Sequence, residues 1–324
     1  MKLLSTRRRF LRTALGAALL GAFAPMLRLL AGGHTVKNAR TLPPWKEESF
    51  ASQDCLRCLV IGDWGAASAL QRKVAQGMAR RAEREKPQWI LSTGDNFYPI
   101  GVSSARDEQF TTKWKDIYSA PSLRLPWYCA LGNHDYGDNP GAQVEYSAID
   151  TQWNMPARYY SFRKDSALCS AEFFVLDTQA LLKGARADQE KQVQWLREAL
   201  KSSTATWRVV VGHHMVRSHG AYGDQPFMLK LVKPLLDEYK VHLYLNGHDH
   251  DLQYIKRPDD AFVCITSGAG GGARDTGYGV HTRYAATDGG FVGLSFTHTR
   301  IHAQFCNAEG AVQYAEDVVE GERR

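Results

Sequence analysis

The sequence lacks several features that would place it in other classes of protein. It has no repeat at a fixed period and no low-complexity tract, which argues against a repeat architecture. It also has no excess of either charge outside its N-terminus. Residues 1–33 hold six cations and no acid, and the rest of the chain has 34 Lys and Arg against 34 Asp and Glu. The basic character therefore belongs to the N-terminus and does not indicate a nucleic acid partner.

The cysteine pattern of a structural zinc site is also missing. Cys55 and Cys58 form one C-x-x-C pair, but no second pair accompanies it. Because Cys58 opens an apolar run, we expect the six cysteines to be buried free thiols, with a redox pair or one or two disulfides as alternatives. The Gly-rich segment 268–272 lacks the Lys-Ser/Thr ending of a nucleotide-binding loop, so we interpret it as a flexible loop at a pocket rim.

The first 33 residues predict an export signal. A basic cluster containing Arg7 and Arg8 resembles a twin-arginine signal, and the uncharged run Thr13–Leu27 follows it. That run has 15 residues, which is below the roughly 18–20 needed to span a bilayer. We therefore expect export of a bacterial protein by the twin-arginine translocase to the periplasm or outside the cell. A retained N-terminal membrane anchor is the alternative.

The remaining chain divides into a lead-in and one domain. Residues 34–54 contain Pro43 and Pro44 with little apolar periodicity, and we interpret them as a linker or extended lead-in. Residues 55–324 suit one large domain better than two.

Within that domain, short apolar runs alternate with helical patterns. We expect strands at 58–61, 89–92, 127–131, 173–176, 209–211, 242–245 and 262–266. We expect helices at 69–84, 107–118, 189–201 and 227–239, and hairpins between 291 and 318. Alternating strands and helices followed by hairpins indicate an α/β domain with mixed sheets.

Five of the expected strands lead directly into a polar motif with a glycine near the turn. The motifs begin at Gly62, Gly94, Gly132, Val210 and Gly247. Ligands of α/β folds bind beyond the carboxyl ends of the strands, which is where these motifs lie. One such motif would mean little, but five in order are hard to obtain by chance.

The motifs supply oxygen and imidazole donors without a thiolate. The candidate ligands are Asp63, Asp95, Tyr98, Asn133, His213, His248 and His250. This set suits iron, zinc or manganese and is too rich in nitrogen for calcium. It exceeds what one tetrahedral metal needs and is enough for two metals if a carboxylate bridges them. Two metals about 3.5–4 Å apart can clamp a phosphate group.

The five motifs resemble those of the metallophosphoesterases, and among these the purple acid phosphatases. Gly65 stands where general metallophosphoesterases usually carry a histidine, and Tyr98 follows Asp95 as in purple acid phosphatases. The segments 132–136, 153–160 and 247–254 look like the small, tartrate-resistant branch. The similar region runs from about residue 56 to 318.

The resemblance implies a fold and a site. The fold is a sandwich of two mixed β-sheets flanked by α-helices. Asp63, Tyr98 and His250 would hold a ferric ion, and Asp95 would bridge to a divalent iron, zinc or manganese ion. Asn133, His213 and His248 would hold that second ion, and the neighbouring His214 would only support or pack against the site.

Two further histidines are implied as catalytic. His134 would contact phosphate or protonate the leaving alcohol. His219 resembles a second histidine near the substrate, with an exposed loop histidine as the alternative.

The implied activity is that of an acid phosphatase. Small phosphate monoesters would be hydrolysed by a metal-bound hydroxide, with an acidic pH optimum, and nucleic acid is not an expected partner. One alternative is a phosphodiesterase or nucleotide hydrolase of the same fold. A second alternative is a non-catalytic phosphate- or metal-binding protein. The oligomeric state has no signal in the sequence.

Overall fold

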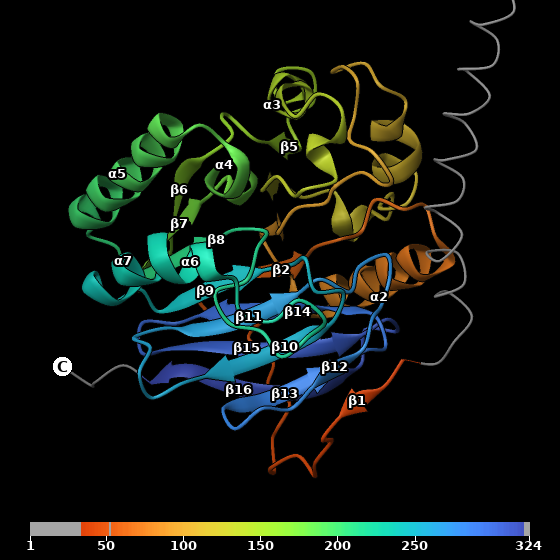
Figure 1. Cartoon of the computed structure of the whole chain (residues 1–324). Coiled ribbons are helices and arrows are strands. Elements are labelled where there is room, and N and C mark those ends of the chain that lie inside the picture. Colours follow the sequence, from red (N-terminus) through yellow and green to blue (C-terminus); the bar gives the residue numbers. More distant parts are fainter. Residues whose placement is uncertain (1–33, 52, 321–324) are drawn as a thin grey trace, which may run out of the picture. The chain divides into compact units, whose positions relative to one another are not determined.

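A computed structural model describes residues 34–51 and 53–320 of the chain. The expected export signal lies outside the described residues. The described residues from Thr35 onward form one compact unit, which contains two seven-stranded mixed sheets (Figure 1). Among the described helices, none is long and apolar enough to cross a membrane.

The first sheet is built around four parallel strands. Its order is β16-β15-β14-β2-β3-β4-β5, with β2 to β5 parallel and β14 to β16 antiparallel. Its strands are β2 (Leu56–Ile61), β3 (Trp89–Ser92), β4 (Trp127–Cys129), β5 (Trp153–Asn154), β14 (Gly290–Phe296), β15 (Arg300–Asn307) and β16 (Val312–Glu320).

The second sheet has the same plan. Its order is β13-β10-β11-β9-β8-β7-β6, with β7, β8, β9 and β11 parallel to one another. Strands β6, β10 and β13 are antiparallel to their neighbours. Its strands are β6 (Tyr160–Asp165), β7 (Ser170–Val175), β8 (Trp207–Val211), β9 (Leu243–Asn246), β10 (Leu252–Lys256), β11 (Val263–Ser267) and β13 (Thr282–Ala286).

Helices and short helical turns connect the strands. They are α2 (Ala69–Glu85), α3 (Gly141–Tyr146), α4 (Thr178–Lys183), α5 (Arg186–Ser202), α6 (Pro226–Leu231), α7 (Lys233–Glu238), the π-helical turn η2 (Phe110–Lys115) and the 3₁₀ turns η3 (Pro121–Leu123) and η4 (Asp135–Gly137). Helices α5, α6 and α7 gather beside β7, β8 and β9 in Figure 1.

Alternation along β8 shows how the layers pack. Val209 and Val211 point into the core shared by both sheets, whereas Val210 packs under α5 to α7 with Leu196 and Leu235. Side chains of a strand alternate between its two faces, so a run that is apolar on both faces must be covered on both. The sheets therefore form a sandwich with helices on an outer face, which confirms the expected fold class.

The segment before the first long strand contributes to the described unit. Strand β1 (Val36–Lys37) pairs in parallel with β12 (Thr276–Gly277). Phe50 is fully buried. Residues 34–54, interpreted above as a linker or extended lead-in, thus hold fixed contacts with the later chain.

Two expected helices differ from the structure. The chain between 107 and 118 forms only the turn η2 with bends around it. The helix expected at 227–239 is divided at Val232 into α6 and α7. Pro234 explains the break, because its nitrogen has no hydrogen to donate and its ring clashes with the carbonyl of the preceding turn.

The six cysteines are buried and free of disulfides. Burial raises the pKa of Cys58 and of Cys129 well above the ordinary value. A thiol that stays protonated is a poor nucleophile and a poor metal ligand, so these residues act as small apolar side chains. The expectation of buried free thiols is confirmed.

Candidate metal centre

The ends of five parallel strands from both sheets bring the seven candidate ligands together. Strands β2, β3 and β4 of the first sheet are followed by Asp63, then Asp95 and Tyr98, then Asn133. Strands β8 and β9 of the second sheet are followed by His213, then His248 and His250. Because the sheets face each other, loops separated by more than a hundred residues converge at one end of the sandwich.

One group of three donors centres on the phenol of Tyr98. Its hydroxyl lies 3.0 Å from Asp63 Oδ1 and 3.1 Å from His250 Nε2. His250 Nε2 is also 3.3 Å from Asp63 Oδ1. The three atoms could therefore bind one ion together.

A second group of three centres on His213. Its Nε2 lies 3.1 Å from Asn133 Oδ1 and 3.1 Å from His248 Nδ1. The imidazoles of His213 and His248 thus direct one nitrogen each toward a common point beside an amide oxygen. This set of donors suits a divalent transition metal.

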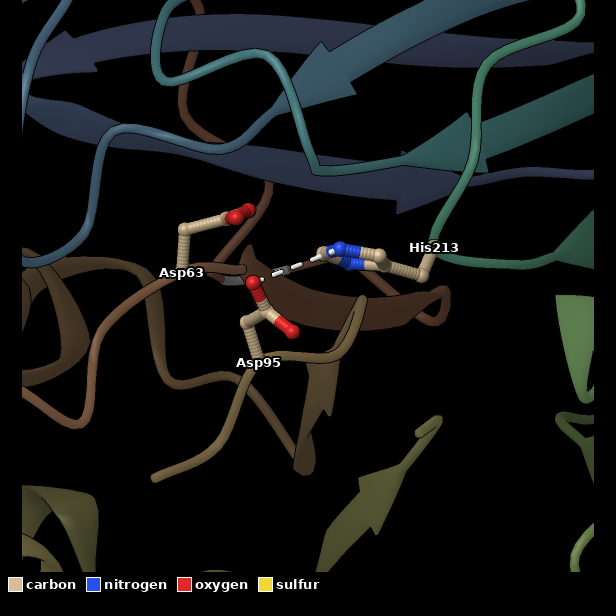
Figure 2. A group of neighbouring side chains, drawn as sticks. All are labelled: Asp63, Asp95 and His213. Carbon is tan, nitrogen blue, oxygen red and sulfur yellow. Dashed lines mark ion pairs between the residues drawn. The ribbon is translucent and has the colours of Figure 1, made fainter. Parts of the chain in front are cut away.

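Asp95 lies between the two groups. Its Oδ2 accepts a hydrogen bond from the Tyr98 hydroxyl at 2.8 Å and is 3.4 Å from His213 Nε2. Figure 2 shows Asp63, Asp95 and His213 converging from separate segments, and one ligand atom from each lies within 4.8 Å of the others. A single carboxylate in contact with both groups is the arrangement that a bridge between two ions requires.

Backbone contacts hold these side chains in place. His213 Nδ1 faces the carbonyl of Thr93 at 3.0 Å, which leaves Nε2 free to face the centre. The backbone N–H of His248 donates to Asp63 Oδ2 at 2.9 Å, and that of His134 donates to Asp95 Oδ1 at 2.8 Å. These contacts fix the orientation of His213, Asp63 and Asp95.

Two glycines leave room for the carboxylates. A Cβ atom on Gly132 would lie 2.1 Å from Asp95 Oδ1, and one on Gly247 would lie 2.3 Å from Asp63 Oδ2. No side chain fits at either position, so glycine at the turns of the third and fifth motifs is a consequence of how closely the loops approach.

The buried carboxylates of the centre favour a bound cation. Asp63 and Asp95 are each only 1% exposed. Burial acts to lower the pKa of His213, but the charges of Asp95 and Asp63 outweigh it and raise that pKa to about 9. Buried carboxylates are costly unless they are paired or bind a metal. Bound metal ions would supply that charge, and oxygen and imidazole donors suit iron, zinc and manganese.

The surroundings of Tyr98 favour the neutral form of its hydroxyl. Burial raises the pKa of its hydroxyl well above the ordinary value, and the nearby charges of Asp63 and Asp95 raise it further. A phenolate at this position therefore needs a strongly charged ion next to its oxygen.

His134 lies at the edge of the centre. Its ring is half-buried, with its centroid 4.4 Å from that of Tyr98. Its Nδ1 is 2.7 Å from the carbonyl oxygen of Pro99. When Nδ1 donates to that carbonyl, Nε2 remains available to a substrate.

The structure places His219 elsewhere. Its side chain is exposed, its backbone N–H donates to Gln253 Oε1 at 2.8 Å, and its ring packs against Gly279. Among the contacts of the described residues, none joins this ring to the seven donors. This placement matches the alternative of an exposed loop histidine.

Three neighbours of the ligands support the loops. His214 lies 2.8 Å from Thr178 Oγ1 and packs beside His248. Asp135 and Asp249 both accept hydrogen bonds from the backbone. Asp135 accepts from the N–H groups of Asn96 and Gly132, and Asp249 from that of Tyr222.

Two residues beside the centre have no signal in the sequence motifs. Tyr222 stacks on the ring of His248, with centroids 4.4 Å apart, and Arg274 Nη1 donates to the Tyr222 hydroxyl at 2.7 Å. Both lie in irregular segments, where periodicity gives no guide to position. Trp64 and Phe97, by contrast, are fully buried core residues.

Comparison with known proteins agrees with this geometry. The family model described as calcineurin-like phosphoesterase matches residues 56–252. Purple acid phosphatase 17 of Arabidopsis thaliana is 34% identical over 291 residues, which are 82% of this chain and 85% of the plant protein. The chain belongs to the purple acid phosphatases. It is accordingly a metal-dependent phosphoesterase, and its relatives are phosphatases.

The similar proteins also include a tartrate-resistant acid phosphatase. Tartrate-resistant acid phosphatase type 5 of Sus scrofa is 34% identical over 237 residues, which are 66% of this chain and 69% of the animal protein. The solved structure of purple acid phosphatase PPD1 from yellow lupin seeds has a TM-score of 0.64 over 86% of this chain and 56% of that chain. At 16% sequence identity, this likeness concerns the fold alone.

Proposed function

We propose that this purple acid phosphatase hydrolyses phosphate monoesters at acid pH with a ferric ion and a divalent iron, zinc or manganese ion. The position of Asp95 carries the proposal, because its carboxylate contacts both groups of donors. The first group, with Tyr98, would hold the ferric ion, and the second, with His213, would hold the divalent ion. When bound, the two ions supply positive charge for the phosphate oxygens and lower the pKa of coordinated water.

The chain's own residues prepare the site for this chemistry. The hydrogen bonds to Asp63 and Asp95 fix both carboxylates, so charge is preorganised and little reorganisation accompanies the reaction. His134 can hold a proton on Nε2 while Nδ1 is bound to the Pro99 carbonyl. That proton would reach the oxygen of the leaving alcohol.

The test combines metal analysis with a visible spectrum and two substrates. The iron-loaded protein should be coloured by charge transfer from Tyr98 to the ferric ion, and Tyr98→Phe should lose that band. It should hydrolyse p-nitrophenyl phosphate faster than bis(p-nitrophenyl) phosphate, with an optimum below neutral pH. Faster turnover of the diester would favour the phosphodiesterase alternative. No hydrolysis of any ester would favour a binding protein.

We also propose export by the twin-arginine translocase, which carries folded proteins and so suits a metal centre filled before export. Replacing both Arg7 and Arg8 by Lys should leave the phosphatase activity in the cytoplasm. Activity that still reaches the periplasm would contradict this route.

A further inference from the structure

The Gly-rich segment 268–272 is packed tightly against the metal centre. A Cβ atom on Gly268 would lie 2.1 Å from the carbonyl oxygen of Asp249, and one on Gly271 would lie 2.4 Å from that of Trp64. Ser68 Oγ, which caps α2, also donates to the carbonyl of Gly271 at 2.7 Å. The Gly-rich segment, interpreted above as a flexible loop, is thus closely packed against its neighbours.

Arg274, which follows the Gly-rich segment, lies beside the metal centre. The backbone N–H of Arg274 donates to the carbonyl of His250 at 2.9 Å. The Arg274 guanidinium lies 5.1 Å from the centroid of the Tyr222 ring and donates to the Tyr222 hydroxyl at 2.7 Å. Because Tyr222 stacks directly on His248, the arginine and the tyrosine form one unit next to the second group of donors.

The unit is held in place, and the Asp249 carboxylate nearby only partly offsets the charge of Arg274. The backbone N–H of Tyr222 donates to Asp249 Oδ1 at 3.1 Å, while 48% of the Tyr222 residue surface stays exposed. The charge of Arg274 acts to lower the pKa of the nearby Asp249 carboxylate, but among the described residues no carboxylate lies within ion-pair distance of Arg274. Its guanidinium donates one hydrogen bond to a described side chain, the Tyr222 hydroxyl, so it retains donors that can bind an anion.

We propose that Arg274 and Tyr222 select phosphate esters that carry a second negative group close to the reacting phosphate. An arginine fork binds carboxylate and phosphate oxygens in pairs, which favours either group over a neutral one. Only the Tyr222 ring separates the Arg274 guanidinium from the candidate ligand His248. The second negative group of a substrate must therefore lie close to the reacting phosphate. Substrates of this class include pyrophosphate and a short phosphorylated hydroxy acid.

The inference rests on the proposed function and is tested by changes in relative rates. We would measure kcat/KM of Arg274→Gln with p-nitrophenyl phosphate, pyrophosphate and phosphoglycolate, each relative to the unchanged protein. A charge-assisted hydrogen bond to a substrate contributes enough for about a tenfold effect or more. We expect that loss, seen mainly as a higher KM, for the two substrates with a second charge. For p-nitrophenyl phosphate the loss should stay below about threefold.

Two further variants separate charge from structure. Arg283→Gln removes an exposed cation from β13, outside the centre, and should change none of the three ratios. Arg274→Lys should restore part of the loss, because a point charge remains without the paired donors. The losses of kcat/KM for pyrophosphate and for phosphoglycolate are then compared. The larger loss shows whether a second phosphate or a carboxylate is the preferred group.

An equal loss with all three substrates, or no loss with any, would overturn the inference. The metal content of each variant must match the unchanged protein, and the side-chain change leaves the backbone contact to His250 intact. If the unchanged protein hydrolyses no phosphate ester, the proposed function itself fails, and that result is distinguishable from a failure of charge selection.

Discussion

Replacing Asp95 by Asn changes one atom at the point where the two groups of donors meet. The amide keeps an oxygen that can accept from the N–H of His134, so the loop retains its hydrogen bond. It loses the negative charge that faces Tyr98 and His213. The carboxylate is 1% exposed, so water cannot substitute for it.

The size of the effect follows from that burial. Removing one partner of a buried charged pair costs about 3–5 kcal/mol. At about 1.4 kcal/mol per factor of ten, this corresponds to a loss of about 10²–10⁴ in affinity for at least one ion. We expect Asp95→Asn to bind fewer ions and to lose hydrolysis by a similar factor.

Thermal unfolding with and without added metal distinguishes this explanation from simple misfolding. The unchanged protein should gain about 4 kcal/mol when free metal is at about 1,000 times the dissociation constant, and the variant should lose most of that gain. The quantity to compare is the gain on adding metal, because Asp95 also faces His213 in the metal-free protein. Asp188→Asn, the same change at an exposed site in α5, is the control. A variant that keeps both ions and hydrolysis within about tenfold would refute the bridging role.

Three further changes test other parts of the structure. His134→Gln should lower kcat by about 10²-fold or more with unchanged metal content, and the loss should be larger for an alkyl phosphate than for p-nitrophenyl phosphate, whose leaving group needs no proton. Ser68→Ala removes the side chain that accepts from Gln71 N–H at the start of α2, and chemical unfolding should show a loss of about 1 kcal/mol. Burial acts to raise the pKa of Asp260, but hydrogen bonds from Arg217 and Lys233 outweigh it and lower that pKa. The pairing with Asp260 therefore stabilises the fold above the unfolded pKa of about 3.9 and is lost as pH falls through the folded pKa. Arg217→Gln should lower the melting temperature at about pH 5 and about pH 7, and the difference should shrink below about pH 4.

The sequence predicted that the seven donors lie close together, and it could do so because the information is local. Each ligand follows a strand end within a few residues, and parallel strands direct such ends to one edge of a sheet. The break between α6 and α7, by contrast, was missed, although Pro234 marks it in the sequence.

Sheet order and loop positions could not be obtained in the same way. Strand β14 lies between β15 and β2, and it pairs Val292 with Val60 across most of the chain. Periodicity shows that Val292 is buried but not which strand lies beside it. Tyr222 and His219 are three residues apart in one irregular loop, and hydrogen bonds from Ser218 and Tyr222 to Asp249 place them differently. Those long-range contacts decide which of the two side chains stacks on His248.

At three of the candidate ligands, the backbone adopts a conformation that is uncommon for residues other than glycine. Asp63, Asp95 and His248 have φ angles of 56°, 52° and 68°, in the left-handed region that favours glycine. Each such residue costs of order 1 kcal/mol relative to an unstrained conformation. A chain optimised for stability alone would place glycine or asparagine there, and it would lose a carboxylate or an imidazole from the centre at each position. The strain persists because a sheet holds the strand that leads into each motif. The same sandwich that buries the core therefore supports the conformations that aim these donors at one point.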